Sequence, residues 1–296
     1  MTSERIVPER WIWIDGRLEP ARSARVPLLD RGVHDGEGLF ETLRVYGRRP
    51  FAWWRHLERL VVSAAELGFP VAPSPELLAR ALAEVLEANQ LGDAVARLTM
   101  TRGVPGRRPT RCGVWVEAEP LEGRLWKGTR AGGARVMVSR APFSPGSIGR
   151  HKTTSRLAYH LAREEARSAG ADEALLVAPH GDLLEGAVSS VFVVRDTRIV
   201  TPPLALGILP GITRAIVLEL CASLGLPAGE ARIDRADLAG AEEIFLVNSV
   251  QEVVPVERFE AAAVPKRAIG ALLAQAYREL VARELNEPNP PPDGAN

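Results

Sequence analysis

The sequence has no long apolar run, no net charge and no apolar leader. Its 37 basic residues balance 37 acidic residues, so the chain has no basic field that would attract nucleic acid or an anionic membrane. No apolar run approaches the roughly 20 residues of a membrane span, and the charged N-terminal segment MTSERIVPER lacks the apolar core of a signal peptide. We therefore expect a cytoplasmic protein without nucleic-acid or membrane partners that acts on small molecules.

Cysteine is nearly absent. Cys112 and Cys221 are the only two cysteines, they lie far apart in the chain, and they fit no metal or redox spacing. The five histidines show no metal-ligand spacing either. The sequence thus predicts no metal site, and it predicts two buried thiols in a reducing compartment.

Lysine is scarce as well. Lys127, Lys152 and Lys266 are the only lysines, so 34 of the 37 basic residues are arginines. Arginine serves as well for solubility and ion pairs, whereas only lysine loses its proton near neutral pH and attacks a carbonyl. Lys152 stands where the irregular segment PFSPGSIGRH gives way to an amphipathic helix, and loops held by a rigid element often carry reactive side chains. The local alternative is a solvated lysine in the first turn of a helix.

The length of 296 residues favours two domains. Loss of periodicity and a gain of glycine and proline predict an interdomain linker at 119–133, between a small N-terminal α/β domain (1–118) and a larger C-terminal α/β domain (134–285). The proline-rich segment 286–296 is predicted to be a disordered tail. Strands and helices alternate without a glycine fingerprint, which favours a mixed α/β fold over a doubly wound sheet.

Periodicity and turn signals predict the individual elements. Asp15-Gly16 indicates a tight hairpin within 11–18. Ser74 and Pro75 indicate the start of a helix. The other predicted strands are 39–46, the segment after 47–49, 94–103, 112–118, 134–139, 173–178, 190–194 and 243–248. The predicted helices are 54–68, 74–89, the segment from Lys152 to Ala169, 213–225 and about 264–285.

Four further groups are candidates for chemistry. Glu185 stands between two apolar strand runs, so it is either a turn residue or a buried acid that needs a cationic partner. Pro210-Gly211 precedes an apolar helix whose free N–H groups and Thr213 hydroxyl suit a phosphate, although ordinary helix capping explains them too. Ser249 lies at the mouth of a strand, and Arg59 is a charged residue among apolar neighbours.

Five blocks occur together in a familiar order. They are the segment 30–60, HKTTSRL with its following helix, LLEGAVSSVF, GILPGITR and FLVNSVQEVVPV. In order and approximate spacing they resemble the class IV aminotransferases, the fold-type-IV pyridoxal phosphate enzymes that include branched-chain aminotransferases, D-amino-acid aminotransferases and aminodeoxychorismate lyases. The resemblance covers about residues 11–256.

The resemblance implies a two-domain fold-type-IV structure whose larger domain binds pyridoxal phosphate. Lys152 would form the internal Schiff base, an aldimine, and later move the proton. Glu185 would keep the pyridine nitrogen protonated. The remaining cofactor contacts that the resemblance implies are Arg59, Ile212, Thr213 and Ser249 at the phosphate and Leu209 near the ring.

The substrate-binding positions of this sequence match the family less closely than its cofactor-binding positions do. The resemblance implies substrate contacts at Arg107, Asp35, Phe40, Thr42 and Val250. Arg107 matches an arginine that grips the substrate carboxylate in D-amino-acid aminotransferases, but the histidine expected two residues later is Pro109. Asp35 replaces a usual aromatic residue, so it either faces the substrate pocket or turns to solvent and caps its loop.

Two other departures separate the chain from parts of the family. Leu157 replaces a tyrosine of the branched-chain enzymes, which favours the D-amino-acid aminotransferase and lyase branches. Ser190 replaces a usual asparagine, which weakens a structural hydrogen bond rather than the chemistry.

The leading hypothesis is an aminotransferase that moves an amino group between an amino acid or amine and a 2-oxo acid through the Lys152 aldimine. The alternative is an aminodeoxychorismate lyase, which shares the first proton transfer and then releases pyruvate to give 4-aminobenzoate. A more remote alternative is a protein that binds pyridoxal phosphate without turnover. The resemblance also implies at least a homodimer. Trp11, Trp13, Trp53 and Trp54 are candidates for its interface, although core packing explains them equally well.

Overall fold

The computed structural model describes residues 9–106 and 111–286, and the chain divides into two compact units. The N-terminal unit comprises residues 1–123 together with 153–155, and the C-terminal unit comprises residues 124–152 and 156–296. Apart from its first residue, Asn286, the tail predicted at 286–296 lies outside the described residues. Within the described ranges, no helix is long and apolar enough to cross a membrane, and no three side chains of His, Cys, Asp or Glu gather as a metal site.

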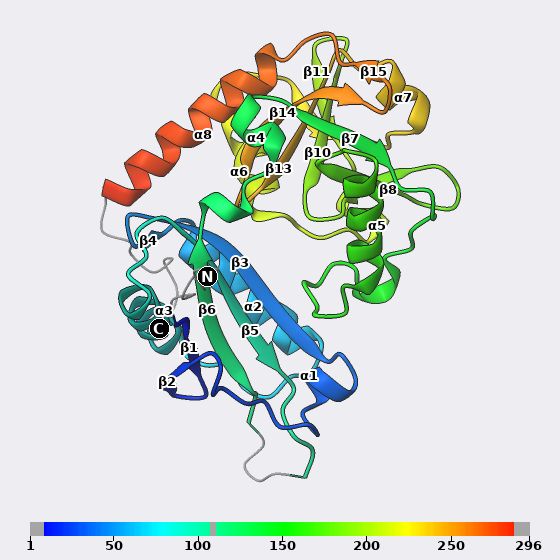
Figure 1. Cartoon of the computed structure of the whole chain (residues 1–296). Helices are drawn as coiled ribbons and strands as arrows, with labels where there is room; N and C mark the ends of the chain where they lie inside the picture. The colour runs from blue at the N-terminus through cyan, green and yellow to red at the C-terminus, as the bar shows by residue number, and fades with distance from the viewer. Residues whose placement is uncertain (1–8, 107–110, 287–296) are drawn as a thin grey trace, which may run out of the picture. The chain divides into compact units, whose positions relative to one another are not determined.

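A six-stranded antiparallel sheet forms the centre of the N-terminal unit (Figure 1). Its strands lie in the order β2-β1-β6-β5-β3-β4. Their bounds are β1 (Trp11–Ile14), β2 (Arg17–Pro20), β3 (Gly38–Tyr46), β4 (Arg49–Pro50), β5 (Ala94–Thr101) and β6 (Val114–Pro120). The predicted hairpin is confirmed, because β1 pairs with β2 and the turn residues Asp15 and Gly16 both have positive φ.

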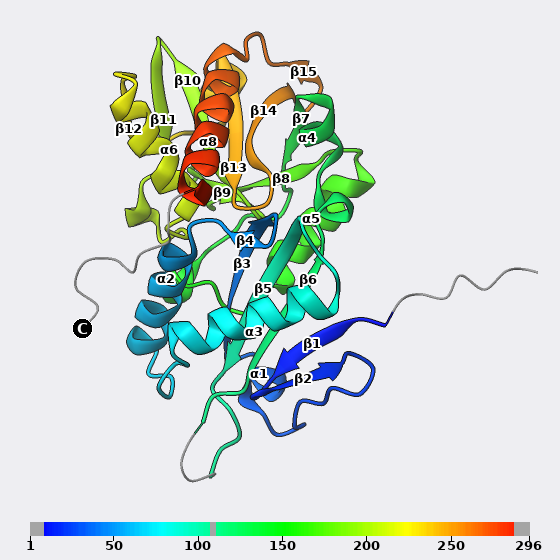
Figure 2. The ribbon, with the colours of Figure 1, turned by 90° about the vertical axis from the view of Figure 1, so that its left-hand side faces the viewer.

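Helices cover one face of this sheet (Figure 2). They are α2 (Trp53–Glu66) and α3 (Pro75–Ala88), whereas the four-residue helix α1 (Arg31–His34) buries no side chain. Ser74 caps α3 as its sequence predicts, because its hydroxyl accepts a hydrogen bond from the N–H of Leu77. Apolar stripes of α2 and α3 pack with the alternate apolar residues of β3, β5 and β6 in one core. Trp13 and Trp53 are buried in that core, so packing accounts for both.

The C-terminal unit contains a nine-stranded mixed sheet. Eight of its strands follow the order β12-β11-β10-β13-β14-β7-β8-β9, and β15 pairs with β14. Their bounds are β7 (Ala134–Val138), β8 (Glu173–Val177), β9 (Leu183–Gly186), β10 (Ser190–Arg195), β11 (Arg198–Thr201), β12 (Ala228–Glu230), β13 (Glu243–Asn248), β14 (Glu252–Phe259) and β15 (Ala262–Ala263). The parallel pairs are β14–β7, β7–β8 and β11–β12, which agrees with the predicted mixed α/β class.

Five α-helices accompany this sheet. They are α4 (Lys127–Ala131), α5 (Leu157–Ser168), α6 (Ile212–Ser223), α7 (Arg235–Ala239) and α8 (Ala268–Asn286). In Figure 2, α8 lies alongside β13 and β14, with which it packs. Buried Glu243 anchors the start of α8, because its carboxylate accepts hydrogen bonds from the N–H groups of Ile269 and Gly270.

Several details differ from the sequence-based expectation, among them the following three. The segment 119–133 contains the end of β6, a short 3-10 turn and α4, rather than irregular chain alone. The last helix begins at Ala268 instead of near Val264, because Pro265 disfavours helical backbone at the residue before it. β14 was not expected, since Pro255 interrupts its apolar run. Proline fits there because the pairing with β7 begins only at Val256.

Candidate active site

Glu185 is a buried acid on β9, as one of its two sequence-based interpretations requires. Its side chain is 5% exposed, and its carboxylate accepts hydrogen bonds of 3.4 Å from the N–H of Leu209 and the hydroxyl of Tyr159. Burial raises the pKa of Glu185 to about 7, against the opposing effects of the Arg156 charge, the Leu209 N–H and the Lys152 charge. Burial therefore outweighs the nearby positive charges of Arg156 and Lys152.

Lys152 lies next to this acid. It stands between a 3-10 turn (Gly146–Ile148) and α5, it is half-buried, and it is near enough for its charge to lower the pKa of Glu185. Two residues 33 positions apart in the sequence thus lie within electrostatic range of each other in the C-terminal unit. The family resemblance assigns both residues to the cofactor.

Arg156 and Tyr159 complete the surroundings of Glu185, and the sequence analysis missed both. The Arg156 guanidinium lies over the Tyr159 ring at 3.3 Å from its centroid and donates a 2.7 Å hydrogen bond to the Ala187 carbonyl. Burial raises the pKa of Tyr159 to about 12, with a further contribution from the Glu185 charge, so the phenol remains a hydrogen-bond donor. No local signal marks these two residues, because their partners lie on β9 and in the segment that follows it.

The start of α6 has the properties of an anion site. Gly211 caps the helix without any side-chain hydrogen bond, and a Cβ at this position would meet the Ser190 hydroxyl at 2.7 Å. Thr213 is 2% exposed, and its hydroxyl has no hydrogen-bond partner among the residues that the structure describes. A buried hydroxyl is rarely left unsatisfied, and the N-terminus of a 12-residue helix favours negative charge.

A turn between β13 and β14 presents Ser249 and Val250. Asn248 shapes this turn, because its side-chain oxygen accepts hydrogen bonds from the N–H groups of Val250 and Gln251, at 2.9 Å and 2.8 Å. The Asn248 amide also donates to the Val188 carbonyl, which ties the turn to the segment after β9. Ser249 is half-buried there and Val250 is buried.

A second buried acid supports the same segment. Glu173 on β8 is fully buried, and its carboxylate accepts hydrogen bonds from the Ser189 hydroxyl (2.8 Å) and the Val188 N–H (3.0 Å). Sequence reasoning missed Glu173, because nothing near it in the chain indicates its partners. The Ser189-Ser190 pair is therefore divided, with Ser189 bound to Glu173 and Ser190 facing the glycine that opens α6.

Arg59 belongs to the N-terminal unit and has a buried partner. From α2, its Nε and Nη2 donate to the two oxygens of Glu41, at 2.8 Å and 2.6 Å. His56, one helical turn earlier, places its Nδ1 2.7 Å from the same carboxylate. Neither Glu41 nor His56 was singled out from the sequence.

The predicted substrate positions that the structure describes in the N-terminal unit are Asp35, Phe40 and Thr42. Phe40 and Thr42 share one face of β3, and the Arg97 guanidinium lies 3.7 Å from the Phe40 ring centroid. Arg97 pairs with Thr42 in the sheet register, yet the sequence analysis did not propose it. Arg107 lies outside the described residues.

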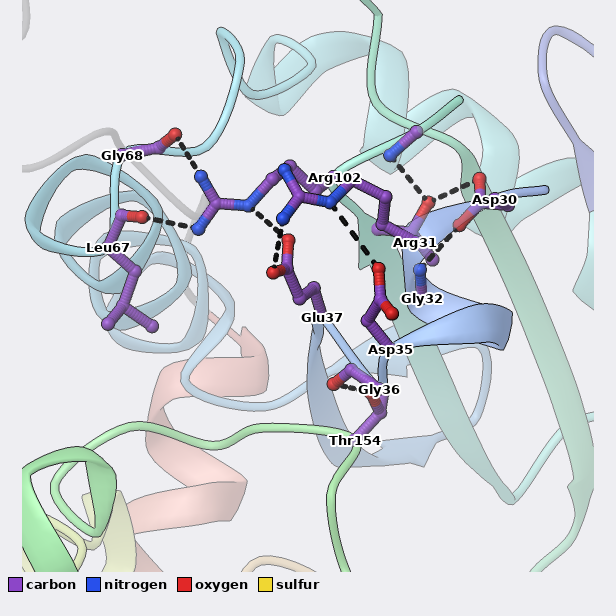
Figure 3. A network of polar contacts seen from close by, with 12 residues as sticks. Asp30, Arg31, Gly32, Asp35, Gly36, Glu37, Leu67, Gly68, Arg102 and Thr154 are labelled. Atoms are coloured by element: carbon purple, nitrogen blue, oxygen red, sulfur yellow. Dashed lines mark hydrogen bonds and ion pairs between the residues drawn. The ribbon is translucent and has the colours of Figure 1, made fainter. Parts of the chain in front are cut away.

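Asp35 ends α1 and takes part in a polar network, shown in Figure 3. Its carboxylate lies 3.1 Å from His34 Nδ1 and 3.6 Å from Arg31 Nε, and its side chain is 45% exposed. Glu37, two residues later, pairs with Arg31 at 2.6 Å and with Arg102 at 2.7 Å.

Thr154 belongs to the same network and rests on the glycine loop beside it. Its hydroxyl donates to the Gly36 carbonyl (Figure 3). Its N–H donates to the Gly38 carbonyl. A Cβ on Gly38 would meet the Thr154 hydroxyl at 2.6 Å, so this close approach requires glycine.

The chain is similar to known proteins over most of its length. A family model described as amino-transferase class IV matches residues 38–259. A putative branched-chain-amino-acid aminotransferase from Methanocaldococcus jannaschii is 32% identical over 88% of this chain and 92% of its own length. A D-alanine aminotransferase from Bacillus licheniformis is 29% identical over 93% of this chain and 98% of its own length.

A solved structure is similar over nearly the whole chain. The T.th. branched-chain amino acid aminotransferase, crystallised with pyridoxamine 5'-phosphate, has a TM-score of 0.82 and 29% identity, covering 94% of this chain and 96% of that one. Fold, family model and relatives therefore agree. The chain belongs to the class IV aminotransferases, a family of pyridoxal phosphate enzymes.

Proposed function

We propose that the chain transfers an amino group between an amino acid and a 2-oxo acid with pyridoxal phosphate bound at Lys152. The observation that carries the proposal is the pair formed by buried Glu185 and neighbouring Lys152. Near neutral pH the Glu185 carboxyl is divided between its neutral and charged forms, so a cationic ring nitrogen beside it would favour the charged form. The similarity to class IV aminotransferases supports the same assignment.

The residues present fit this cofactor. Pyridoxal phosphate, when bound, supplies an electron sink for the bonds at the substrate's amino-bearing carbon. Lys152 would hold the cofactor through its amine and would move the proton at the substrate's amino-bearing carbon. Glu185 would keep the ring nitrogen protonated, and Leu209, whose N–H binds Glu185, would contact the ring.

The phosphate would lie at the start of α6. There Ile212 and Thr213 offer backbone N–H groups, and the Thr213 hydroxyl would gain the partner that it lacks among the described residues. Ser249 would add a hydroxyl from the turn after β13, and Arg59 a cation. Each of these groups stabilises a dianion without changing its own protonation.

The substrate side chain is the finer part of the proposal. We assign Phe40, Thr42 and Val250 to the substrate pocket, Arg107 to the substrate carboxylate, and Asp35 to its rim. The two relatives described above bear different names, one branched-chain and one D-alanine. Leu157 in place of the branched-chain enzymes' tyrosine favours the D-amino-acid side.

A half-reaction panel tests both parts. The holoenzyme is mixed singly with paired D- and L-forms of alanine, glutamate, leucine and valine, and loss of the yellow cofactor band is followed. We expect a response to D-alanine or D-glutamate that exceeds the response to the mirror image. Bleaching only by L-leucine and L-valine would overturn the D-assignment, and no bleaching with any donor would favour the lyase reaction over transamination.

Lys152 itself is tested by substitution. Lys152→Ala should remove the yellow colour and the activity while the far-ultraviolet circular dichroism stays the same. Lys152→Arg is the matched control, because arginine keeps the positive charge beside Glu185 but cannot form an imine. If either variant retained both colour and turnover, the assignment would be refuted.

We also propose that the chain forms at least a homodimer, as the family resemblance implies. Leu28, Leu29 and Val33 form an exposed apolar group around α1, and apolar groups of this kind often mark contacts between chains. Light scattering coupled to gel filtration should give at least twice the 32.1 kDa chain mass. A single-chain mass at micromolar concentration would contradict this proposal.

A further inference from the structure

Glu41 is a charged residue on the core face of a strand. In β3 the residues Leu39, Leu43 and Val45 alternate into the apolar core of the N-terminal unit, and Glu41 occupies the same face between them. Its side chain is 1% exposed. An acid at such a position is stable only when hydrogen bonds and opposite charge replace its lost hydration.

Two side chains of α2 provide that replacement. Arg59 binds both carboxylate oxygens through Nε and Nη2, and His56 Nδ1 approaches Oε2 at 2.7 Å. His56 and Arg59 stand three positions apart and therefore share one helix face. Burial alone would raise the pKa of Glu41, but the Arg59 charge and the His56 hydrogen bond outweigh it and hold the pKa at about 2. Glu41 is thus a carboxylate, and the His56 Nδ1 must donate to it.

Exposure within this trio differs. Glu41 and His56 are each 1% exposed, whereas Arg59 is 12% exposed. Arg59 is therefore the member of the network that reaches the surface. A two-point bond to a carboxylate also fixes the plane of a guanidinium, which a single hydrogen bond does not. Packing alone gives no reason for the trio, since apolar side chains of similar size commonly replace buried ion pairs without loss of stability.

We infer that Glu41 and His56 are positioning residues, which hold the Arg59 guanidinium in the orientation that binds the cofactor phosphate. The inference rests on the proposed function, which assigns Arg59 to that phosphate. Because the guanidinium is already oriented, binding a phosphate does not require ordering of a long, flexible side chain. His56 binds the Oε2 atom of the same carboxylate, so that Glu41 cannot change its position together with Arg59.

Glu41→Gln tests the inference with a change of a few atoms. Glutamine offers one accepting oxygen to three donors, and its amide N–H groups would face the N–H groups of Arg59 or His56. Because His56 can change tautomer and accept at Nδ1, the two-point bond to Arg59 is the contact that is lost, whichever way the amide is turned. The cofactor-free variant is titrated with pyridoxal phosphate and, separately, with pyridoxal, which lacks the phosphate. Binding is followed by the visible absorbance band and by tryptophan fluorescence.

The deciding result is a ratio, namely the dissociation constant for pyridoxal divided by the dissociation constant for pyridoxal phosphate. We expect Glu41→Gln to weaken the binding of pyridoxal phosphate roughly tenfold, as is common when a residue that orients a binding group is lost, and to change the binding of pyridoxal less than about twofold. In an Arg59→Met background the same substitution should add nothing, because its effect passes through Arg59. Equal losses for both ligands, or additive losses in the double variant, would overturn the inference.

Glu243→Gln serves as the matched control. Glu243 is also a buried acid, but its hydrogen bonds anchor α8, so its substitution should lower stability and leave the ratio unchanged. If Glu41→Gln does not fold, His56→Leu should still lower the ratio, and His56→Asn, whose amide nitrogen can replace Nδ1, should restore most of it. An unchanged ratio in His56→Leu would overturn the inference.

Failure of the inference and failure of the proposed function give different results. If the wild-type protein does not bind pyridoxal phosphate, the proposed function is wrong, and the inference with it. If wild type binds it at Lys152 but Arg59→Met leaves the ratio unchanged, only the assignment of Arg59 and the positioning role are refuted.

Discussion

Replacing Glu185 with glutamine should change how the stability of the cofactor-free protein depends on pH. Burial raises the pKa of this carboxyl from its ordinary 4.5 to about 7. Between those values the native protein keeps a proton that the unfolded chain has released. The free energy of unfolding therefore falls as the pH rises through this window. Below the window, the stabilisation that comes from the protonated Glu185 is fully present. At roughly 1.4 kcal/mol per pH unit, the wild type loses about 3 kcal/mol between pH 4.5 and pH 7.

Glutamine has a similar shape and does not titrate, so Glu185→Gln removes this loss. Its carbonyl can accept the Leu209 N–H, and its amide can donate to the Tyr159 hydroxyl. All other titrating groups are common to the two proteins, so the difference between their free energies of unfolding isolates this site. We expect the difference to shift in favour of the variant by about 3 kcal/mol from about pH 4.5 to about pH 8.

Urea denaturation of the full-length cofactor-free proteins, at half-unit steps of pH, measures this difference. A difference that stays constant within about 0.5 kcal/mol, the usual error of such comparisons, would show that Glu185 is not a desolvated acid. With pyridoxal phosphate bound, the shift should shrink, because a cationic ring nitrogen beside the carboxylate favours its charged form.

Two further predictions concern the phosphate end and the glycine loop. Thr213→Val should leave the cofactor-free protein at least as stable, since it removes a buried hydroxyl without a partner among the described residues, but it should weaken the binding of pyridoxal phosphate roughly tenfold, as for a lost hydrogen bond to a charged group. Thr213→Ser should bind pyridoxal phosphate nearly as tightly as the wild type, and equal affinity for all three proteins would contradict the assignment. Gly38→Ala should lower the free energy of unfolding, measured by urea denaturation, by about 1–3 kcal/mol because its Cβ would overlap Thr154. Gly92→Ala, with nothing within 4 Å of its added Cβ, should lower it by less than about 0.5 kcal/mol, and equal losses of stability would refute the close approach of Gly38 and Thr154.

Local signals allowed much of the fold to be predicted. The Asp15-Gly16 hairpin and the Ser74 cap depend on neighbouring residues only, and the structure contains both. Strand β14 was missed because Pro255 interrupts its pattern, and its position in the sheet depends on distant partners in β7 and β13. Pairing between segments far apart in the chain, such as β14 and β7, leaves no mark in local periodicity.

The residues of the candidate site likewise divide into those that a local sequence signal marks and those that it does not. Lys152 stood out by the scarcity of lysine, and Glu185 by its position between apolar runs. Tyr159 and Glu173 could not be found, because their roles depend on contacts across the sheet. Glu41 does have a local signal in the sequence, because it is an acid at a position where strand alternation places an apolar side chain.

The central claim, that Lys152 is the amine that holds the cofactor, is tested most directly by reductive trapping. The chain has only three lysines, at positions 127, 152 and 266, and the Lys266 ammonium is paired with Glu242 at 2.6 Å. The holoenzyme is reduced with sodium borohydride, digested and analysed by mass spectrometry. The account predicts a phosphopyridoxyl group on the peptide containing Lys152 and none on the other two lysines. A stoichiometric label on Lys127 or Lys266, with Lys152 unmodified, would contradict it.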